Sequence, residues 1–222
     1  MDPFKIIEVK ESVFANNNQQ ADALRQRLRG EKTFLLNLMS SPGSGKTSTI
    51  LRTIEQLRNE MAIGVMEADI DSAVDADKIA QAGIRTIQIH TGGACHLDAE
   101  MTAQGIDAFG TGDLDFVILE NVGNLVCPAE FDTGAVKSAM ILSVPEGDDK
   151  PLKYPLMFST VDVLLINKID CLGYFEFDAD AVRERAKKLN PDITVFEVSA
   201  KSGQGFGAWT DWLRGEVKKW NS

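Results

Sequence analysis

A glycine-containing loop between an apolar run and a helical pattern carries the first residues whose chemistry can be assigned. The segment SSPGSGKTS, residues 40–48, follows the strand-like run TFLLNLM at 33–39 and precedes the helical pattern KTSTILRTIEQLRNE. Gly43 and Gly45 would let backbone N–H groups close around a phosphate, and the helix N-terminus would add its positive dipole. Ser40 replaces the first glycine of the pattern G-x-x-x-x-G-K-[ST]. The order of strand, loop and helix nevertheless predicts a phosphate-binding loop rather than an ordinary turn.

Within this loop, two side chains have roles that the chemistry of a nucleoside triphosphate demands. Lys46 would reach the β- and γ-phosphates, and the hydroxyl of Thr47 would ligate Mg²⁺. The predicted nucleotide-binding residues of the loop are Gly43, Ser44, Gly45, Lys46, Thr47 and Ser48.

The base would be selected by a second motif, INKID at 166–170, which resembles the N-K-x-D motif of GTPases. A carboxylate at Asp170 can accept from the N1–H and the 2-amino group of guanine, which adenine does not offer together. Asn167 would brace the loop, and the stem of Lys168 would lie along the base. The segment SAKSG at 199–203 resembles the fifth GTPase motif and adds Ser199, Ala200 and Lys201 to the predicted nucleotide site. A charged strand-to-helix turn is the alternative interpretation.

Carboxylates for Mg²⁺ and water are expected after two further strands. Glu120 ends the run DFVILE, and ENVG resembles the D-x-x-G switch motif with Glu in place of Asp. Acidic residues also follow the run AIGVMEA, at Asp69, Asp71, Asp75 and Asp77. We favour Asp75, with Asp69 behind it, although acids at a helix N-terminus are also explained by the helix dipole. The predicted catalytic residues are Lys46, Glu120 and Asp75, and the predicted Mg²⁺ ligands are Thr47, Asp75, Glu120 and Asp69. Because no glutamine or arginine finger can be named, we expect slow intrinsic turnover.

Sulfur and imidazole ligands lie in two other loops. GGACHLDAE contains Cys95 and His96, and ENVGNLVCP contains Cys127. Thiolate and imidazole together suit Zn²⁺ or Ni²⁺. The alternative is that both cysteines are small core residues and the histidine starts a helix. Three ligands leave a tetrahedral ion one short, so a two-fold dimer could supply six ligands for shared ions.

The elements that must position these residues read as one α/β domain. Strand-like apolar runs occupy 33–39, 62–68, 85–90, 115–120, 138–144, 161–167 and 193–199, and helical patterns separate several of them. Such alternation predicts a P-loop NTPase fold with a doubly wound, mostly parallel sheet of about seven strands flanked by helices. Residues 1–32 are predicted to be a helical lead-in, and 33–222 the GTPase domain. Parallel strands would bring all the loops named above to the carboxyl edge of the sheet.

Composition excludes several classes of function. The formal net charge of −10 argues against general binding to nucleic acid, which needs a basic surface. The first residues, MDPFKIIEVKE, lack the features of a signal peptide, and no apolar run approaches the ~18 residues of a membrane helix. The three cysteines lack the spacing of a disulfide scaffold. We therefore expect a cytoplasmic protein with free thiols that binds neither nucleic acid nor membrane.

Taken together, the motifs resemble the hydrogenase nickel-incorporation GTPases, the HypB family, which are related to the urease nickel chaperone. The matching stretches are LMSSPGSGKTS, CHLDAE, ENVGNLVCPAEFD, EGDDKPLKYP and NKID. The resemblance implies a homodimer, favoured by GTP and metal, that assists nickel insertion into NiFe hydrogenase. It implies a maturation partner, the hydrogenase large subunit as client, and Cys95, His96 and Cys127 as metal ligands at the dimer interface. Residues 1–30 contain no Cys or His, so the N-terminal nickel motif of some members is not expected within them.

Lys153, in EGDDKPLKYP, has two interpretations. It could approach the nucleotide phosphates across the dimer, as a finger residue would, or it could be solvated like most residues of a charged run.

Three other functions remain open from the sequence. A regulatory GTPase could hold a structural Zn²⁺ at its dimer interface, using the same cysteine and histidine ligands. A GTPase chaperone of another metalloenzyme, such as a cobalamin-dependent mutase, would need no Cys/His ligands. A P-loop kinase would leave NKID and SAK without a role.

Overall fold

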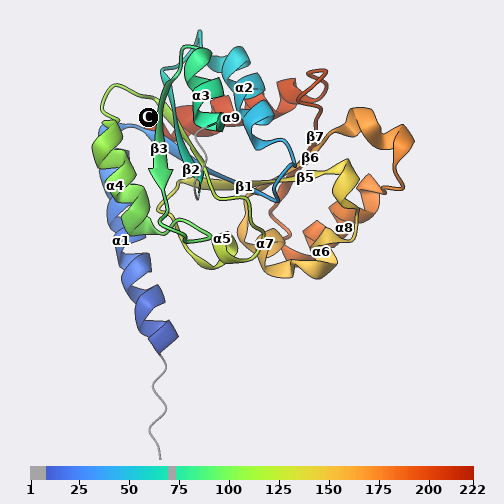
Figure 1. The fold of residues 1–222 in the computed structure, drawn as a ribbon, viewed down its shortest axis with the longest axis horizontal. Coiled ribbons are helices and arrows are strands. Elements are labelled where there is room, and N and C mark those ends of the chain that lie inside the picture. The colour runs from blue at the N-terminus through green and yellow to red at the C-terminus, as the bar shows by residue number, and fades with distance from the viewer. Residues whose placement is uncertain (1–8, 70–73) are drawn as a thin grey trace, which may run out of the picture.

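The protein is built around one parallel sheet. The computed structural model describes residues 9–69 and 74–222, and in these ranges seven strands pair in the order β3-β2-β4-β1-β5-β6-β7 (Figure 1). Every pairing is parallel. The strands are β1 Phe34–Ser40, β2 Ile63–Asp69, β3 Arg85–His90, β4 Phe116–Glu120, β5 Lys137–Ser143, β6 Val163–Asn167 and β7 Thr194–Glu197. All seven predicted strand runs are therefore strands, with ends shifted by at most a few residues.

Helices connect the strands and cover both faces of the sheet. They are α1 Val9–Glu31, α2 Lys46–Leu57, α3 Val74–Gln81, α4 Ala99–Phe109, α5 Cys127–Glu130, α6 Lys150–Lys153, α7 Pro155–Thr160, α8 Ala179–Leu189 and α9 Phe206–Asn221. Two 3₁₀ turns, η1 Val144–Glu146 and η2 Ile169–Tyr174, follow β5 and β6. Helices α5, α6 and α7 have no periodic signal in the sequence, because each is shorter than two turns. Among the described residues, no helix is both long enough and apolar enough to cross a membrane.

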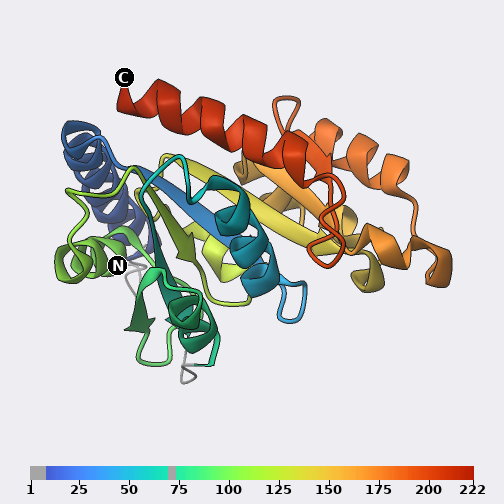
Figure 2. The same cartoon turned by 90° about the horizontal axis from the view of Figure 1, so that it is seen from above.

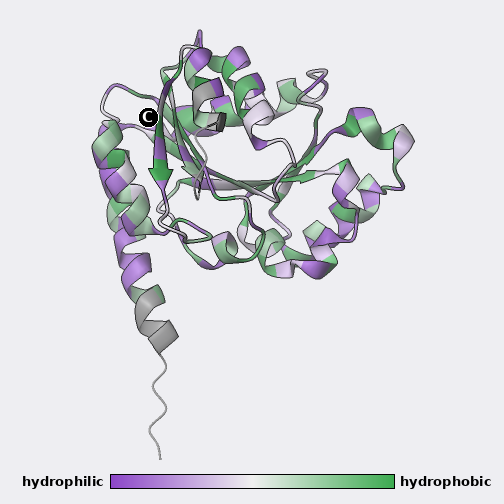
Figure 3. Ribbon diagram, viewed as in Figure 1, coloured by the Kyte–Doolittle hydropathy of each residue, from purple (hydrophilic) through white to green (hydrophobic). Residues whose placement is uncertain are grey.

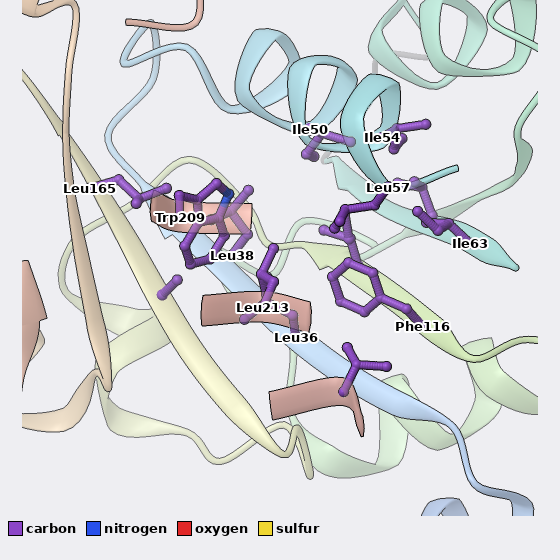
Figure 4. Close-up of a cluster of buried hydrophobic side chains, with 14 of the residues drawn as sticks. Leu36, Leu38, Ile50, Ile54, Leu57, Ile63, Phe116, Leu165, Trp209 and Leu213 are labelled. Carbon is purple, nitrogen blue, oxygen red and sulfur yellow. The ribbon is translucent and has the colours of Figure 1, made fainter. Parts of the chain in front are cut away.

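One face of the sheet packs against α2, α3 and α9. Alternate residues of β1, such as Leu36 and Leu38, contact this layer, which includes Ile50 of α2 and the indole of Trp209 of α9 (Figure 4). The buried Trp209 Nε1–H donates to Thr53 Oγ1 at 3.0 Å, which joins α9 to α2. Figure 2 shows α9 running across the sheet beside α2. These contacts hold the start of α2 at the carboxyl end of β1.

The opposite face is covered by α1 and α4 on one side and by α7 and α8 on the other (Figure 1). The sheet is mainly hydrophobic and the surrounding helices are mixed, as the colours of Figure 3 show. Ala21, Leu24 and Leu28, which the sequence places on one face of the N-terminal helix, are buried. Leu24 and Leu28 belong to the same apolar cluster as Leu35 and Val117. The helical lead-in thus packs onto the sheet, while the predicted domain boundary at residue 32 stays a prediction.

Burial of α1 in this cluster gives a test of its contribution to stability. Leu28 is completely buried, so Leu28→Ala should lower the free energy of unfolding by about 2–5 kcal/mol, through lost contacts and a cavity. The measurement is denaturant unfolding followed by circular dichroism. Gln26→Ala, an exposed change on the same helix, should be nearly neutral. Equal stability of the two variants would mean that α1 adds little to the core.

Candidate functional site

The phosphate loop lies between β1 and α2 and has the backbone shape that the glycines predict. Gly43 and Gly45 have φ angles of 76° and 101°, in the left-handed region that suits glycine. Helix α2 begins at Lys46, so its first N–H groups face the loop. The Nζ of Lys46 donates to Ser40 Oγ at 3.1 Å, and Ser40 Oγ donates to the carbonyl of Ser41 at 2.7 Å. The serine that replaces the usual glycine therefore positions the lysine in the nucleotide-free protein.

Asn167, the first residue of N-K-x-D, joins the phosphate loop to the last GTPase-like motif. Its Nδ2 donates to the carbonyl of Ser44 at 3.0 Å, and its Oδ1 accepts from the N–H of Ala200 at 3.1 Å. A Cβ at Gly45 would lie 2.7 Å from Nδ2, so only glycine leaves room for this bond. The next residue, Lys168, donates from Nζ to the carbonyl of Gly43 at 2.7 Å. The structure thus brings the phosphate loop, N-K-x-D and SAK together.

The carboxylate expected to choose the base is exposed and is oriented by a hydroxyl. Ser199 Oγ donates to Asp170 Oδ1 at 2.6 Å, and the same Oγ accepts from the N–H of Ser202 at 3.1 Å. This hydrogen bond lowers the pKa of Asp170, and the charge of Lys201 acts in the same direction. Asp170 is therefore held as an anion that can accept hydrogen bonds.

Arg52 of α2 is a supporting residue that the sequence reading missed. Its Nε and Nη2 each donate at 3.2 Å, to the carbonyls of Ala200 and Lys201. The SAK segment is thereby attached to the helix that follows the phosphate loop. A basic residue in the second turn of that helix was the available signal, but a charged helix face explains it equally well from sequence.

The switch-like segment ENVG lies against the phosphate loop. A Cβ at Gly123 would lie 3.1 Å from Pro42 Cγ and 3.4 Å from Lys46 Nζ, so its backbone approaches both residues closely. Glu120 is buried at the end of β4, and it is opposite Glu67 of β2, also buried, in the strand register. Glu67 was missed because it reads as one charge inside an apolar run.

Hard oxygen donors suited to Mg²⁺ are available at this position. They are the hydroxyl of Thr47, in the first turn of α2, and the carboxylate of Glu120. The remaining candidates cannot be compared with them, because Asp71 and the side chains of Asp69, Asp75 and Asp77 lie outside the described residues.

The sulfur and imidazole ligands converge from the loop after β3 and from the first residue of α5, where the sequence predicted a loop. The ligand atoms of Cys95, His96 and Cys127 lie within 4.8 Å of one another, and all three residues are partly exposed. Cys95 Sγ is 3.8 Å from His96 Nδ1. Among the described residues this is the one group of three or more Cys, His, Asp and Glu side chains close enough to share a metal ion.

Hydrogen bonding and burial change the protonation of two members of this group. A side-chain hydrogen bond with Cys127 raises the pKa of Cys95, because it favours the protonated thiol, and burial and the charge of Cys127 act in the same direction. Burial lowers the pKa of His96, although the negative charges of Asp98 and Glu130 act to raise it. A neutral imidazole is the form that binds metals. The ring of His96 stacks on Phe131, with centroids 4.0 Å apart, which fixes its orientation.

Comparison with known proteins identifies the family to which this chain belongs. Residues 34–197 match the family described as the nucleotide-binding domain of CobW/HypB/UreG. Over 209 residues, 94% of its length, the chain is 43% identical to the hydrogenase maturation factor HypB of Azotobacter chroococcum mcd 1, of which 68% is covered. The chain belongs to the HypB family. The resemblance inferred from the sequence is thereby confirmed.

Solved structures agree with this assignment. HypB from Helicobacter pylori, crystallised in complex with nickel, superposes with a TM-score of 0.86 at 38% identity, covering 92% of this chain and 96% of that one. HypB from Archaeoglobus fulgidus gives a TM-score of 0.85 at 39% identity, covering 91% and 99%. The predicted fold class, a P-loop NTPase with a doubly wound sheet, is confirmed by these matches, and "mostly parallel" becomes fully parallel in the described residues.

Lys153 contacts no part of the phosphate loop in this single chain of the HypB family. Its Nζ pairs with Asp149 Oδ2 at 2.5 Å, one helical turn away, and both side chains are well exposed. The hydrogen bond to Asp149 raises the pKa of Lys153. Within one chain, Lys153 is therefore a solvated residue of a charged run. Contact of Lys153 with a nucleotide across a dimer stays a proposal.

The hydroxyl of Ser199 can be tested as the cause of the low Asp170 pKa. In Ser199→Ala the pKa of the Asp170 carboxyl should rise toward its ordinary value, because the strongest hydrogen bond to the anion is gone. Carboxyl-detected NMR titration measures it. A carboxylate with a lowered folded pKa stabilises the fold above its unfolded pKa and loses that contribution as pH falls, so the variant should lose this part of its acid sensitivity.

Ser202→Ala is the matched control for this titration. It removes a neighbouring hydroxyl that makes no hydrogen bond to Asp170, and it keeps the backbone N–H that donates to Ser199. An unchanged Asp170 pKa in Ser199→Ala, or an equal rise in both variants, would contradict the assignment.

Proposed function

We propose that the protein is a GTP-binding and GTP-hydrolysing metallochaperone that assists nickel insertion during maturation of NiFe hydrogenase. The observation that carries the proposal is the group formed by Cys95, His96 and Cys127 on loops adjoining the phosphate site of a HypB-family domain. The proposed nucleotide switch and soft-metal site would thus share one edge of one sheet. Membership in a family whose relatives are named for hydrogenase maturation supports a hydrogenase as the protein that receives the metal.

The nucleotide would be bound by three sets of groups. Backbone N–H groups of the phosphate loop and Lys46 would hold the phosphates, and Asp170 would accept from guanine. Bound Mg²⁺, held by Thr47 and Glu120, would neutralise charge developing on the phosphate oxygens. Glu120, buried beside the phosphate loop, would also orient the water that cleaves GTP to GDP and phosphate. Turnover should be slow, because the motifs supply neither a glutamine nor an arginine finger.

Nickel is proposed as the cargo. Two thiolates and an imidazole suit both Ni²⁺ and Zn²⁺, and a HypB relative crystallised with nickel favours the former. All three cysteines are free thiols, which fits the reducing cytoplasm. The client would be the hydrogenase large subunit, reached with a partner from the same maturation machinery. A structural Zn²⁺ in a regulatory GTPase is the alternative, and it would not be released when the nucleotide changes.

A homodimer would complete the ligand shell of the metal. Exposed apolar side chains, which are costly to leave in water, lie next to Cys127 and on α6 and α7: Val126, Leu152 and Leu156. Helix α7 contacts both α5 and α6 along one side of the molecule (Figure 1). Burial of this surface against a second copy would join two metal sites, and would allow Lys153 to exchange Asp149 for the partner's nucleotide.

Asp170→Asn tests recognition of the base. The amide should weaken GTP binding and improve xanthosine triphosphate binding, each by about tenfold or more, because xanthine has a carbonyl where guanine has its 2-amino group. The measurement is the rate of hydrolysis of each nucleotide at limiting concentration, which reports the change in nucleotide preference. Asp192→Asn, an exposed change of the same kind, should preserve the preference for GTP. Parent-like use of both nucleotides by Asp170→Asn would mean that the base is bound elsewhere.

Cys127→Ala tests the metal site. Removal of one of three ligands should weaken Ni²⁺ and Zn²⁺ binding by about tenfold or more and reduce metal-dependent dimerisation, while GTP binding by the metal-free protein stays nearly unchanged. Metal titration with absorption spectroscopy and light scattering gives both readouts. Cys171→Ala makes the same chemical change outside the Cys/His group and should leave metal binding unaltered. If both variants bind metal as the parent does, Cys127 is only a half-buried thiol.

A further inference from the structure

We infer that Asn124 is a positioning residue that transmits the nucleotide state to the Cys/His metal site, with Asn121 as its buried anchor. The inference rests on the proposed function and adds the residues that regulate the metal site. It derives from hydrogen bonds that connect the segment after β4 to the loop that carries Cys95 and His96.

The segment 120–127 touches both sites. Gly123 approaches the phosphate loop so closely that a Cβ there would meet Pro42 and Lys46 Nζ. Cys127 lies four residues further along the chain. Four residues span at most about 14 Å, so a change of backbone at Gly123 cannot leave the Cys127 loop unaffected unless the intervening residues absorb it.

Asn121 ties this segment to the sheet and to the other metal loop. It is completely buried, and its Nδ2 donates to Asn37 Oδ1 of β1 at 3.1 Å. Its Oδ1 accepts from the N–H of Val122 at 2.9 Å and from the N–H of Leu97, the residue after His96, at 3.3 Å. A single amide thus fixes the start of the switch-like segment and the end of the Cys95–His96 loop.

Asn124 forms the second link, next to the residue that contacts the phosphate loop. Its Oδ1 accepts from the N–H of Val126 at 2.8 Å, which shapes the turn leading into Cys127. Its Nδ2 donates to the carbonyl of Cys95 at 3.4 Å, a long bond. One side chain therefore contacts the backbone on both sides of the metal site. Movement of the segment when a γ-phosphate arrives would change the spacing of the two cysteines through this amide.

Asn17 of α1 provides an internal comparison. Its Oδ1 accepts from the N–H of Ala99 at 2.9 Å, and its Nδ2 donates to the carbonyl of Asp132 at 2.9 Å. It therefore joins the start of α4, which follows the loop of Cys95 and His96, to the segment after α5, which begins at Cys127. Asn17 should hold the loops together in every nucleotide state, whereas Asn124 should make their spacing depend on that state.

The experiment measures Ni²⁺ affinity of the full chain with GDP and with a non-hydrolysable GTP analogue, using thiolate-to-nickel absorption. In the parent the two affinities should differ about fivefold or more. In Asn124→Ala and Asn124→Asp the ratio should approach one, with GTP affinity of the metal-free protein unchanged. Asn124→Asp keeps the acceptor for Val126 and removes only the donor to Cys95, so it separates the link from the turn. Its added charge acts on Ni²⁺ in both states and largely cancels in the ratio.

Asn17→Ala is the matched control. It should weaken Ni²⁺ binding in both nucleotide states by the same factor and keep the parent ratio. Thermal unfolding of each variant checks that the fold is intact. If Asn124→Ala does not fold, the affinity ratio measured for Asn124→Asp decides the test.

Two results would overturn the inference, and they differ from failure of the proposed function. A parent-like ratio in Asn124→Asp, or a ratio lost equally in Asn17→Ala, would show that the Asn124 amide is not the specific link. A parent ratio of one, in a protein that hydrolyses GTP and binds Ni²⁺, would refute the inference alone. A parent that binds neither GTP nor Ni²⁺ would refute the proposed function as well.

Discussion

The hydrogen bond from Asn167 Nδ2 to the carbonyl of Ser44 sets the distance between the two halves of the nucleotide site. The same amide accepts from Ala200, so three loops that follow β1, β6 and β7 share one buried side chain. Gly45 has to be glycine for this reason as well as for its positive φ angle. Lys168 and Arg52 add bonds to loop carbonyls, and together these contacts would preorganise the proposed phosphate and base subsites.

The metal site has a different construction. Its ligands lie on two loops that are joined by neutral side-chain amides, with bonds of 3.3 Å and 3.4 Å to the loop that carries Cys95. Long neutral bonds are individually weak, so they can re-form in a second arrangement at little cost. A rigid nucleotide site next to a softer metal site would let phosphate chemistry change metal affinity, as the proposed function requires.

The partial exposure of the three ligands also has a consequence for assembly. Cys95, His96 and Cys127 come from one chain and leave the shell of a four-coordinate ion incomplete. Exposed apolar side chains begin at Val126, directly beside Cys127. A second copy that covers this surface would remove apolar area from water and supply further ligands in the same step. Metal binding and dimerisation are then linked by a common free energy.

Patterns in the sequence were enough to predict the strands, the phosphate loop and the family. Continuous apolar runs specify strands buried on both faces, and glycines at positive φ leave few alternatives for the backbone of residues 40–48. The residues Cys95, His96 and Cys127 could be selected from sequence because parallel strands send successive loops to one edge of the sheet. The assignment needed only ligand chemistry and chain topology.

Tertiary structure decided which supporting residues hold these groups. Asn121, Asn124 and Arg52 act through hydrogen bonds to backbone atoms at least 24 residues away in the chain. A backbone carbonyl or N–H exists at every such position, so no residue type in the partner loop marks the contact. The short helices α5–α7 were also invisible, because one turn has no periodicity and forms only where packing against the sheet supports it.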